Sequence, residues 1–177
     1  MEGTQTGKVK ILHIGDSHIQ ADFASGKIRS LFAEDVRFPV NERGFLFPYK
    51  LAKTNNPPNY SVQYTGVWEG KKSVRRTDFS RWGLAGISAS TFSADASITI
   101  NPNSLADSRT NYKIQRVKVF FPVYDEKSFE VKIKVAEGNS LTSFLMGDGF
   151  VEFALLNPQS EVTLYLEKTA EAQNHFV

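Results

Sequence analysis

The alternation of apolar and polar residues in the C-terminal half of the chain most constrains its fold. From about Ser90 onward helical periodicity disappears, and short runs follow in which every second residue is apolar. Between Phe129 and Val135 the apolar residues are separated by single glutamate and lysine residues. Successive side chains of a strand point to opposite faces, so this pattern predicts a half-buried antiparallel strand.

Further runs of the same kind predict a series of strands. They cover residues 117–123, 151–155 and 162–166, and the pair Ile98 and Ile100 stands at the start of the series. Glycine-containing stretches and Asn157-Pro158 separate the later runs. Short strands bounded by turn residues in this way are typical of a β-sandwich, which we expect to span residues 89–177.

The N-terminal part has a different pattern. Residues Val9–Ile14 form an apolar run that ends at Gly15, and apolar residues at helical spacing follow from Ala21 onward. The predicted order is therefore a buried strand, a tight turn and a helix, which is the opening of an α/β unit. A proline-rich connection covers residues 38–59, and Ser61–Thr65 alternates as a second strand would. We expect residues 1–88 to be an incomplete α/β domain.

Composition excludes several classes of site. The chain of 177 residues has no cysteine, so it has no disulfide, thiol nucleophile or thiolate metal site. Its formal net charge of +2 gives no general attraction for nucleic acid. No window approaches the roughly 18 apolar residues of a membrane span. The first residues, MEGTQTGK, lack the apolar segment of a secretory signal, so the signal of an exported protein would have been removed.

The segment Gly15-Asp16-Ser17-His18 is the main candidate site. A serine at a strand-to-helix turn exposes its hydroxyl and places its amide where an oxyanion can be held, which suits acyl transfer. Asp16 and His18 also have the spacing of an Asp-x-His metal pair. A polar turn with no chemistry is the third interpretation.

The motif resembles block I of the SGNH or GDSL-type hydrolases. Its extended form, Gly15 to Phe23, is similar to the peptidoglycan O-acetylesterase branch and to related proteins of Bacteroides-type bacteria. In that branch a β-sandwich similar to a carbohydrate-binding module interrupts the hydrolase domain. The resemblance implies a flavodoxin-like α/β opening in residues 1–88 and a jelly-roll-like insert in residues 89–177, a mixed α+β chain.

The same resemblance implies the chemistry. Ser17 would be the nucleophile and its amide an oxyanion donor, with an O-acetylated glycan or another ester as substrate, no cofactor and no metal. A periplasmic or cell-surface location in a bacterium is implied as well. The family takes its base from a late Asp-x-x-His, but Ala172 stands three residues before His175, and Gly138-Asn139 lacks the spacing of the Gly-x-Asn oxyanion segment. We therefore expect the N-terminal portion of an esterase, inactive without the missing base.

Two alternatives stay open at this point. One is a non-catalytic, glycan-binding β-sandwich protein. The other is similarity to calcineurin-like metallophosphoesterases, in which Asp16 and His18 would bind a metal. Such a site needs further ligands, and neither Gly147-Asp148 nor Asn174-His175 has the required context.

Other notable residues have ordinary structural interpretations. The basic cluster, defined as Lys71, Lys72, Arg75 and Arg76, stands near Trp68 and Trp82 and is expected to be a solvated loop, with an anionic glycan or a phosphate backbone as alternative partners. His13 is expected to be a buried core imidazole. The phenylalanines, which include Phe45, Phe47, Phe120, Phe121, Phe150 and Phe153, are expected in the core.

Overall fold

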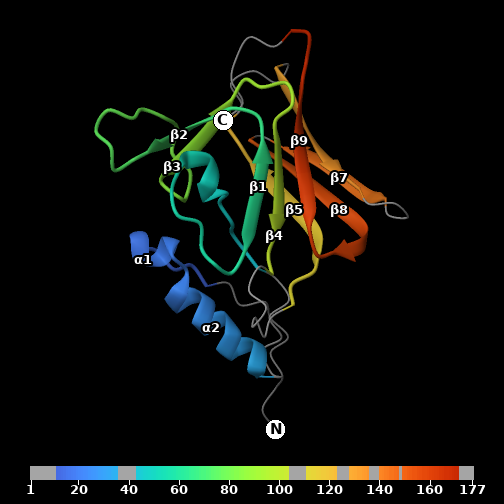
Figure 1. Cartoon of the computed structure of the whole chain (residues 1–177). Coiled ribbons are helices and arrows are strands. Elements are labelled where there is room, and N and C mark those ends of the chain that lie inside the picture. The colour runs from blue at the N-terminus through green and yellow to red at the C-terminus, as the bar shows by residue number, and fades with distance from the viewer. Residues whose placement is uncertain are drawn as a thin grey trace.

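A computed structural model describes residues 11–35, 43–103, 111–122, 128–135, 140–147 and 149–171, with only the backbone described over 142–147. The described chain is a mixed α+β structure with mostly antiparallel sheets and few helices (Figure 1). The helical elements are α1 (Ser17–Gln20), α2 (Phe23–Glu34) and the 3-10 helix η1 (Tyr49–Ala52). The strands are β1 (Ser61–Thr65), β2 (Trp68–Lys72), β3 (Ile87–Thr91), β4 (Ser97–Asn101), β5 (Ile114–Phe120), β6 (Phe129–Lys134), β7 (Leu141–Gly147), β8 (Phe150–Gln159) and β9 (Val162–Lys168).

The described strands form three antiparallel sheets. A four-stranded sheet has the order β1-β4-β9-β6, a three-stranded sheet has the order β5-β8-β7, and β2 pairs with β3 alone. The predicted alternation is confirmed in β6, where Val131 and Ile133 are buried and lie opposite Leu166 and Leu164 of β9. The expected strands at 61–65, 98–100, 151–155 and 162–166 are also present.

One apolar core joins the two larger sheets. It contains buried residues of β6 and β9 from one sheet and Val151, Phe153 and Leu155 of β8 from the other. Trp68 of β2 also belongs to it, and its indole N–H donates to the backbone oxygen of Thr65 at 2.8 Å. Each fully buried side chain of this size contributes about 1.5–3 kcal/mol, so this cluster is the main source of stability.

The strand predicted at Val9–Ile14 is wrong over its described part. Residues 11–14 have no regular structure, and Ile11, Leu12 and Ile14 are 70%, 73% and 80% exposed. His13 is exposed too, so it is not a core imidazole. A buried strand needs neighbours that accept its backbone hydrogen bonds and cover its faces, and within the described residues no strand pairs with this segment.

The sheets begin earlier in the chain than the expected boundary at residue 88. β1 pairs with β4, and β2 pairs with β3, which itself spans residue 88. Three strands, β2, β3 and β7, were not predicted. The sequence of β2, WEGKK, reads as a polar turn, and only its pairing with β3 and its packing on η1 make it a strand. The division of the chain into two domains stays a prediction.

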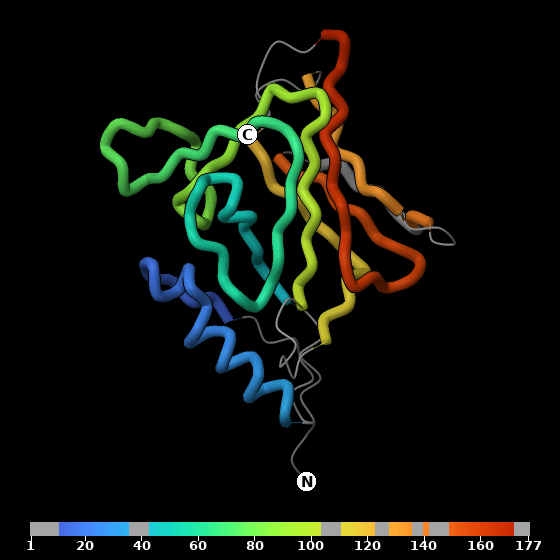
Figure 2. The backbone as a smooth tube through the Cα atoms, viewed as in Figure 1, coloured from blue at the N-terminus to red at the C-terminus, as the bar shows by residue number. Residues whose placement is uncertain are grey.

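The helix expected after Ala21 is present as α2, but neither α1 nor α2 buries an apolar residue. Phe23, Ile28 and Leu31 are exposed, and both helices lie to one side of the strands (Figure 2). No helix among the described residues has the length and apolar character needed to cross a membrane. Two of the phenylalanines expected in the core, Phe45 and Phe120, are largely exposed, because the first lies in a connection and the second ends β5.

Candidate functional site

Ser17 is the first residue of α1 and is exposed. Asp16 caps this helix: its carboxylate accepts a hydrogen bond from the backbone N–H of His18 at 3.0 Å, and its backbone oxygen accepts from Ile19 and Gln20. An aspartate is a preferred residue at this position because its side chain satisfies a free N–H of the first turn. Among the described contacts the Ser17 hydroxyl has no hydrogen-bond partner, so it is open to solvent and to a substrate.

No base accompanies Ser17 in the described part of the chain. His13 and His18 are exposed, and neither imidazole donates or accepts a hydrogen bond with the Ser17 hydroxyl there. His175, together with Ala172 and Asn174, lies outside the described residues, as do Gly138-Asn139 and Asp148. The described geometry therefore contains an exposed hydroxyl without the group that would remove its proton.

The metal interpretation gains nothing from the geometry. The Asp16 carboxylate already serves as the helix cap, and the described ranges contain no group of three or more histidine or acidic side chains able to hold a metal ion. Sites that bind Mn, Fe or Zn need several converging ligands, which Asp16 and His18 alone do not supply.

Gln20 and Asp22, which follow Ser17 in the chain, join the helical segment to the rest of the described chain. The Gln20 amide donates to the Asn55 backbone oxygen at 2.8 Å and to the Thr54 hydroxyl at 3.3 Å. Asp22 is the one buried residue between residues 11 and 35, at 8% exposure. Its carboxylate accepts hydrogen bonds from four side chains, those of Ser25, Arg29, Arg43 and Asn59. We call Asp22, Arg29, Arg43 and Asn59 the Asp22 cluster.

The contacts of this cluster shift the pKa of both Asp22 and Arg43. Burial raises the pKa of the Asp22 carboxyl, but hydrogen bonds from Ser25, Asn59 and Arg29 and the charge of Arg43 outweigh it, so the net pKa lies below the ordinary value. Burial and the nearby charge of Arg29 lower the pKa of Arg43, and Asp22 opposes this effect. Sequence reasoning missed these residues as a cluster. The only available signal was the position of Asp22 inside the Gly15–Phe23 motif.

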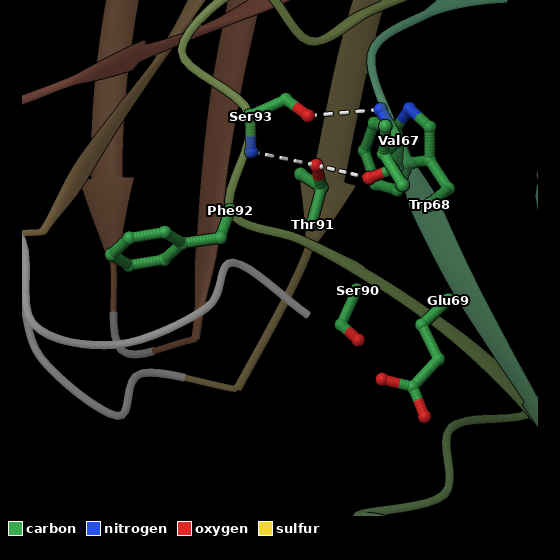
Figure 3. Close-up of a pocket in the computed structure, with 7 residues that line it drawn as sticks. All are labelled: Val67, Trp68, Glu69, Ser90, Thr91, Phe92 and Ser93. Atoms are coloured by element: carbon green, nitrogen blue, oxygen red, sulfur yellow. Dashed lines mark hydrogen bonds between the residues drawn. The ribbon is translucent and has the colours of Figure 1, made fainter.

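A shallow pocket lies where β2 meets β3 and the turn after it (Figure 3). Its volume is about 370 Å³, and it is lined by Val67, Trp68, Glu69, Ser90, Thr91, Phe92 and Ser93. The Thr91 hydroxyl donates to the Val67 backbone oxygen at 2.7 Å, and the Ser93 hydroxyl accepts from the Val67 N–H at 2.8 Å. These two hydroxyls hold the turn. The other polar side chains of the lining are those of Glu69 and Ser90, which stand opposite each other across β2 and β3.

The expectation of a solvated loop holds for only half of the basic cluster. Arg75 and Arg76 are exposed, while Lys71 and Lys72 in β2 are half-buried. Trp82 is exposed but Trp68 is a core residue, so the two indoles do not form a common platform.

Comparisons of the chain with protein-family models, with curated proteins and with solved structures found no match. The geometry of the Ser17 turn and the resemblance of its motif therefore carry the functional proposal.

Proposed function

We propose that this chain is the N-terminal portion of an SGNH or GDSL-type serine esterase that hydrolyses O-acetyl or other short acyl esters on a glycan. The observation that carries the proposal is the exposed Ser17 hydroxyl, without a described partner, on a turn capped by Asp16. Ser17 attacks the acyl carbonyl, the sugar hydroxyl leaves, and water releases the acid from the acyl-enzyme. The base comes from an Asp-x-x-His elsewhere in the complete protein.

The surroundings of Ser17 support this proposal. Ile11, Leu12 and Ile14 are strand-forming residues left exposed, and α2 exposes Phe23, Ile28 and Leu31. These are the positions that a flavodoxin-like α/β domain would bury against further strands of its sheet. In the same proposal the antiparallel sheets form the jelly-roll-like insert. A bacterial periplasmic or cell-surface location follows from the resemblance alone.

The test uses the complete gene product and the substitution Ser17→Ala. We expect a fluorophosphonate probe to label the native protein and not the variant, and we expect acetate release from an acetylated glycan to fall at least a thousandfold, since nucleophile and base act as a unit. Ser73 is also an exposed serine, so Ser73→Ala is the matched control and should keep full activity. Undiminished hydrolysis by Ser17→Ala would refute the esterase.

A second candidate function is glycan binding without catalysis, favoured by the outer face of the four-stranded sheet. Leu164 and Leu166 of β9 are buried, so Tyr165 between them points outward, where it is 39% exposed and lies opposite Ser97 and Lys132. A tyrosine ring among hydroxyl and charged groups suits a sugar, which offers both an apolar face and hydroxyls.

The glycan-binding candidate predicts that this chain is retained on insoluble peptidoglycan and that Tyr165→Ala lowers retention about tenfold, the loss of roughly 1.4 kcal/mol. Tyr64→Ala is the control, because Tyr64 is similarly exposed but shares the opposite face with Ile98 and Leu164. Equal retention of both variants and the native chain would contradict the assignment of this face.

A further inference from the structure

The Ser17 turn is held to the sheets by polar contacts rather than by an apolar core. Neither α1 nor α2 buries an apolar side chain, and Asp22 is the one buried residue of the described segment 11–35. The hydrogen bonds of Gln20 and those of Asp22 join the helices to the connection before β1. These two side chains therefore contribute to the orientation of α1, and with it to that of Ser17.

Asp22 also sets the angle between the two helices. Its φ of 57° and ψ of 21° are left-handed, a conformation that is uncommon for residues other than glycine, asparagine and aspartate. Such a residue persists when its surroundings over-determine it, and such residues cluster at functional sites. Here the four side-chain donors to the carboxylate are the surroundings that hold it.

Arg43 links the Asp22 cluster to Tyr60, the residue that precedes β1. Arg43 donates to Asp22 at 2.7 Å and to Asn59 at 3.1 Å, and its guanidinium lies 5.5 Å from the ring centre of Tyr60. Tyr60 is buried, donates its hydroxyl to the Phe47 backbone oxygen at 2.7 Å and directly precedes β1. A continuous path of contacts thus runs from β1 through Arg43 and Asp22 to the start of α2.

We infer that Asp22 is a positioning residue for the Ser17 nucleophile: its carboxylate holds α1 and α2 at a set orientation to the sheets. This inference rests on the proposed function. Asp22 does not touch the reacting atoms, so its loss changes the rate of attack by Ser17 rather than the binding of the ester. A misplacement of about 1 Å at a nucleophile can cost a hundredfold in rate.

The decisive variant is Asp22→Asn in the complete gene product. Asparagine keeps the shape of the side chain and tolerates the left-handed conformation, so the substitution removes mainly the charge and one acceptor oxygen. We expect kcat for p-nitrophenyl acetate and the rate of fluorophosphonate labelling of Ser17 to fall together by at least tenfold. KM should change less than threefold, with the circular dichroism spectrum of the folded protein retained. Asp95→Asn, which neutralises an exposed aspartate, is the matched control and should label at the native rate.

A second variant keeps the test decisive if Asp22→Asn does not fold. A Cβ added at Gly26 would lie 2.9 Å from the Asn59 amide nitrogen that donates to Asp22, so Gly26→Ala displaces this donor without altering the carboxylate. We expect Gly26→Ala to slow labelling at least threefold with KM unchanged. Native labelling rates in both folded variants would overturn the positioning role, provided that Ser17→Ala is unlabelled. Persistent labelling of Ser17→Ala would instead overturn the proposed function itself.

Discussion

At the residue scale, Asp22 shows how contacts distant in sequence stabilise an uncommon local conformation. Its donors Arg43 and Asn59 stand 21 and 37 residues further along the chain, yet both lie 2.7 Å from the same carboxylate oxygen. Arg43 is itself largely buried, so the pair neutralises two charges that would each be costly alone. Truncation of Asp22 removes the carboxylate that pairs with the Arg43 guanidinium, whereas truncation of Arg43 leaves Asp22 paired with Arg29.

The pH dependence of stability tests this interaction. The pKa of Asp22 in the folded protein lies below its ordinary value of 3.8. The contribution of the ionised carboxylate to the free energy of unfolding is therefore complete above pH 3.8 and is lost as the pH falls through the pKa of the folded protein. At pH 6 we expect Asp22→Asn to lower the free energy of unfolding by about 1–3 kcal/mol. Urea titrations followed by circular dichroism at pH 6 and at pH 3 measure the effect. The difference between native and variant should shrink at pH 3, and an equal difference at both values would contradict the assignment.

At the scale of elements, β2 depends on its neighbours more than on its own sequence. Gly70 in the middle of β2 packs against η1 so closely that an added Cβ would lie 2.2 Å from the Ala52 Cα. Leu51 and Ala52 of η1 are buried in this contact region. The glycine permits backbone to approach backbone, which explains why a strand of polar sequence remains attached to the fold.

Gly70→Ala should therefore separate β2 from η1 and lower the free energy of unfolding by about 2–4 kcal/mol, the range of a severe overpacking defect. Gly83→Ala is the matched control, since no heavy atom lies within 4 Å of the Cβ position there. It should change stability by less than about 0.5 kcal/mol. Thermal unfolding of the two variants compares them, and equal melting temperatures would show that η1 moves away at no cost.

At the scale of the whole molecule, stability is concentrated in the sheets. Phe153 of β8 is 2% exposed within the shared core, whereas Phe23 at the start of α2 is 72% exposed. The sheets also bring together strands that are far apart in sequence, such as β4 and β9. The helical segment adds little apolar burial to this arrangement.

The same substitution at these two phenylalanines measures the difference. Phe153→Ala in this 177-residue chain should cost about 3–5 kcal/mol through lost burial and a cavity. Phe23→Ala should cost less than about 0.5 kcal/mol, because its ring is already in water. Denaturant titrations of both variants provide the comparison. A large loss of unfolding free energy in Phe23→Ala would mean that α2 unfolds cooperatively with the core.

Several elements follow from local sequence alone. Period-2 alternation located β1, β6 and β9, because burial on one face of a strand requires an apolar residue at every second position. Helical spacing located α2, whereas α1, which begins at Ser17, was expected to be a turn. These features depend on neighbouring residues, which a single sequence displays directly.

Tertiary structure decided the rest. The apolar run at residues 11–14 reads as a buried strand, but it stays exposed where no described strand pairs with it. The sequence of β2 reads as a turn, but β2 pairs with β3 and packs against η1 at Gly70. Asp22, Arg43 and Asn59 became one cluster only through the path of the chain between them. Propensity and pattern are local, whereas burial and ion pairing depend on which distant segments meet, and that is set by the fold as a whole.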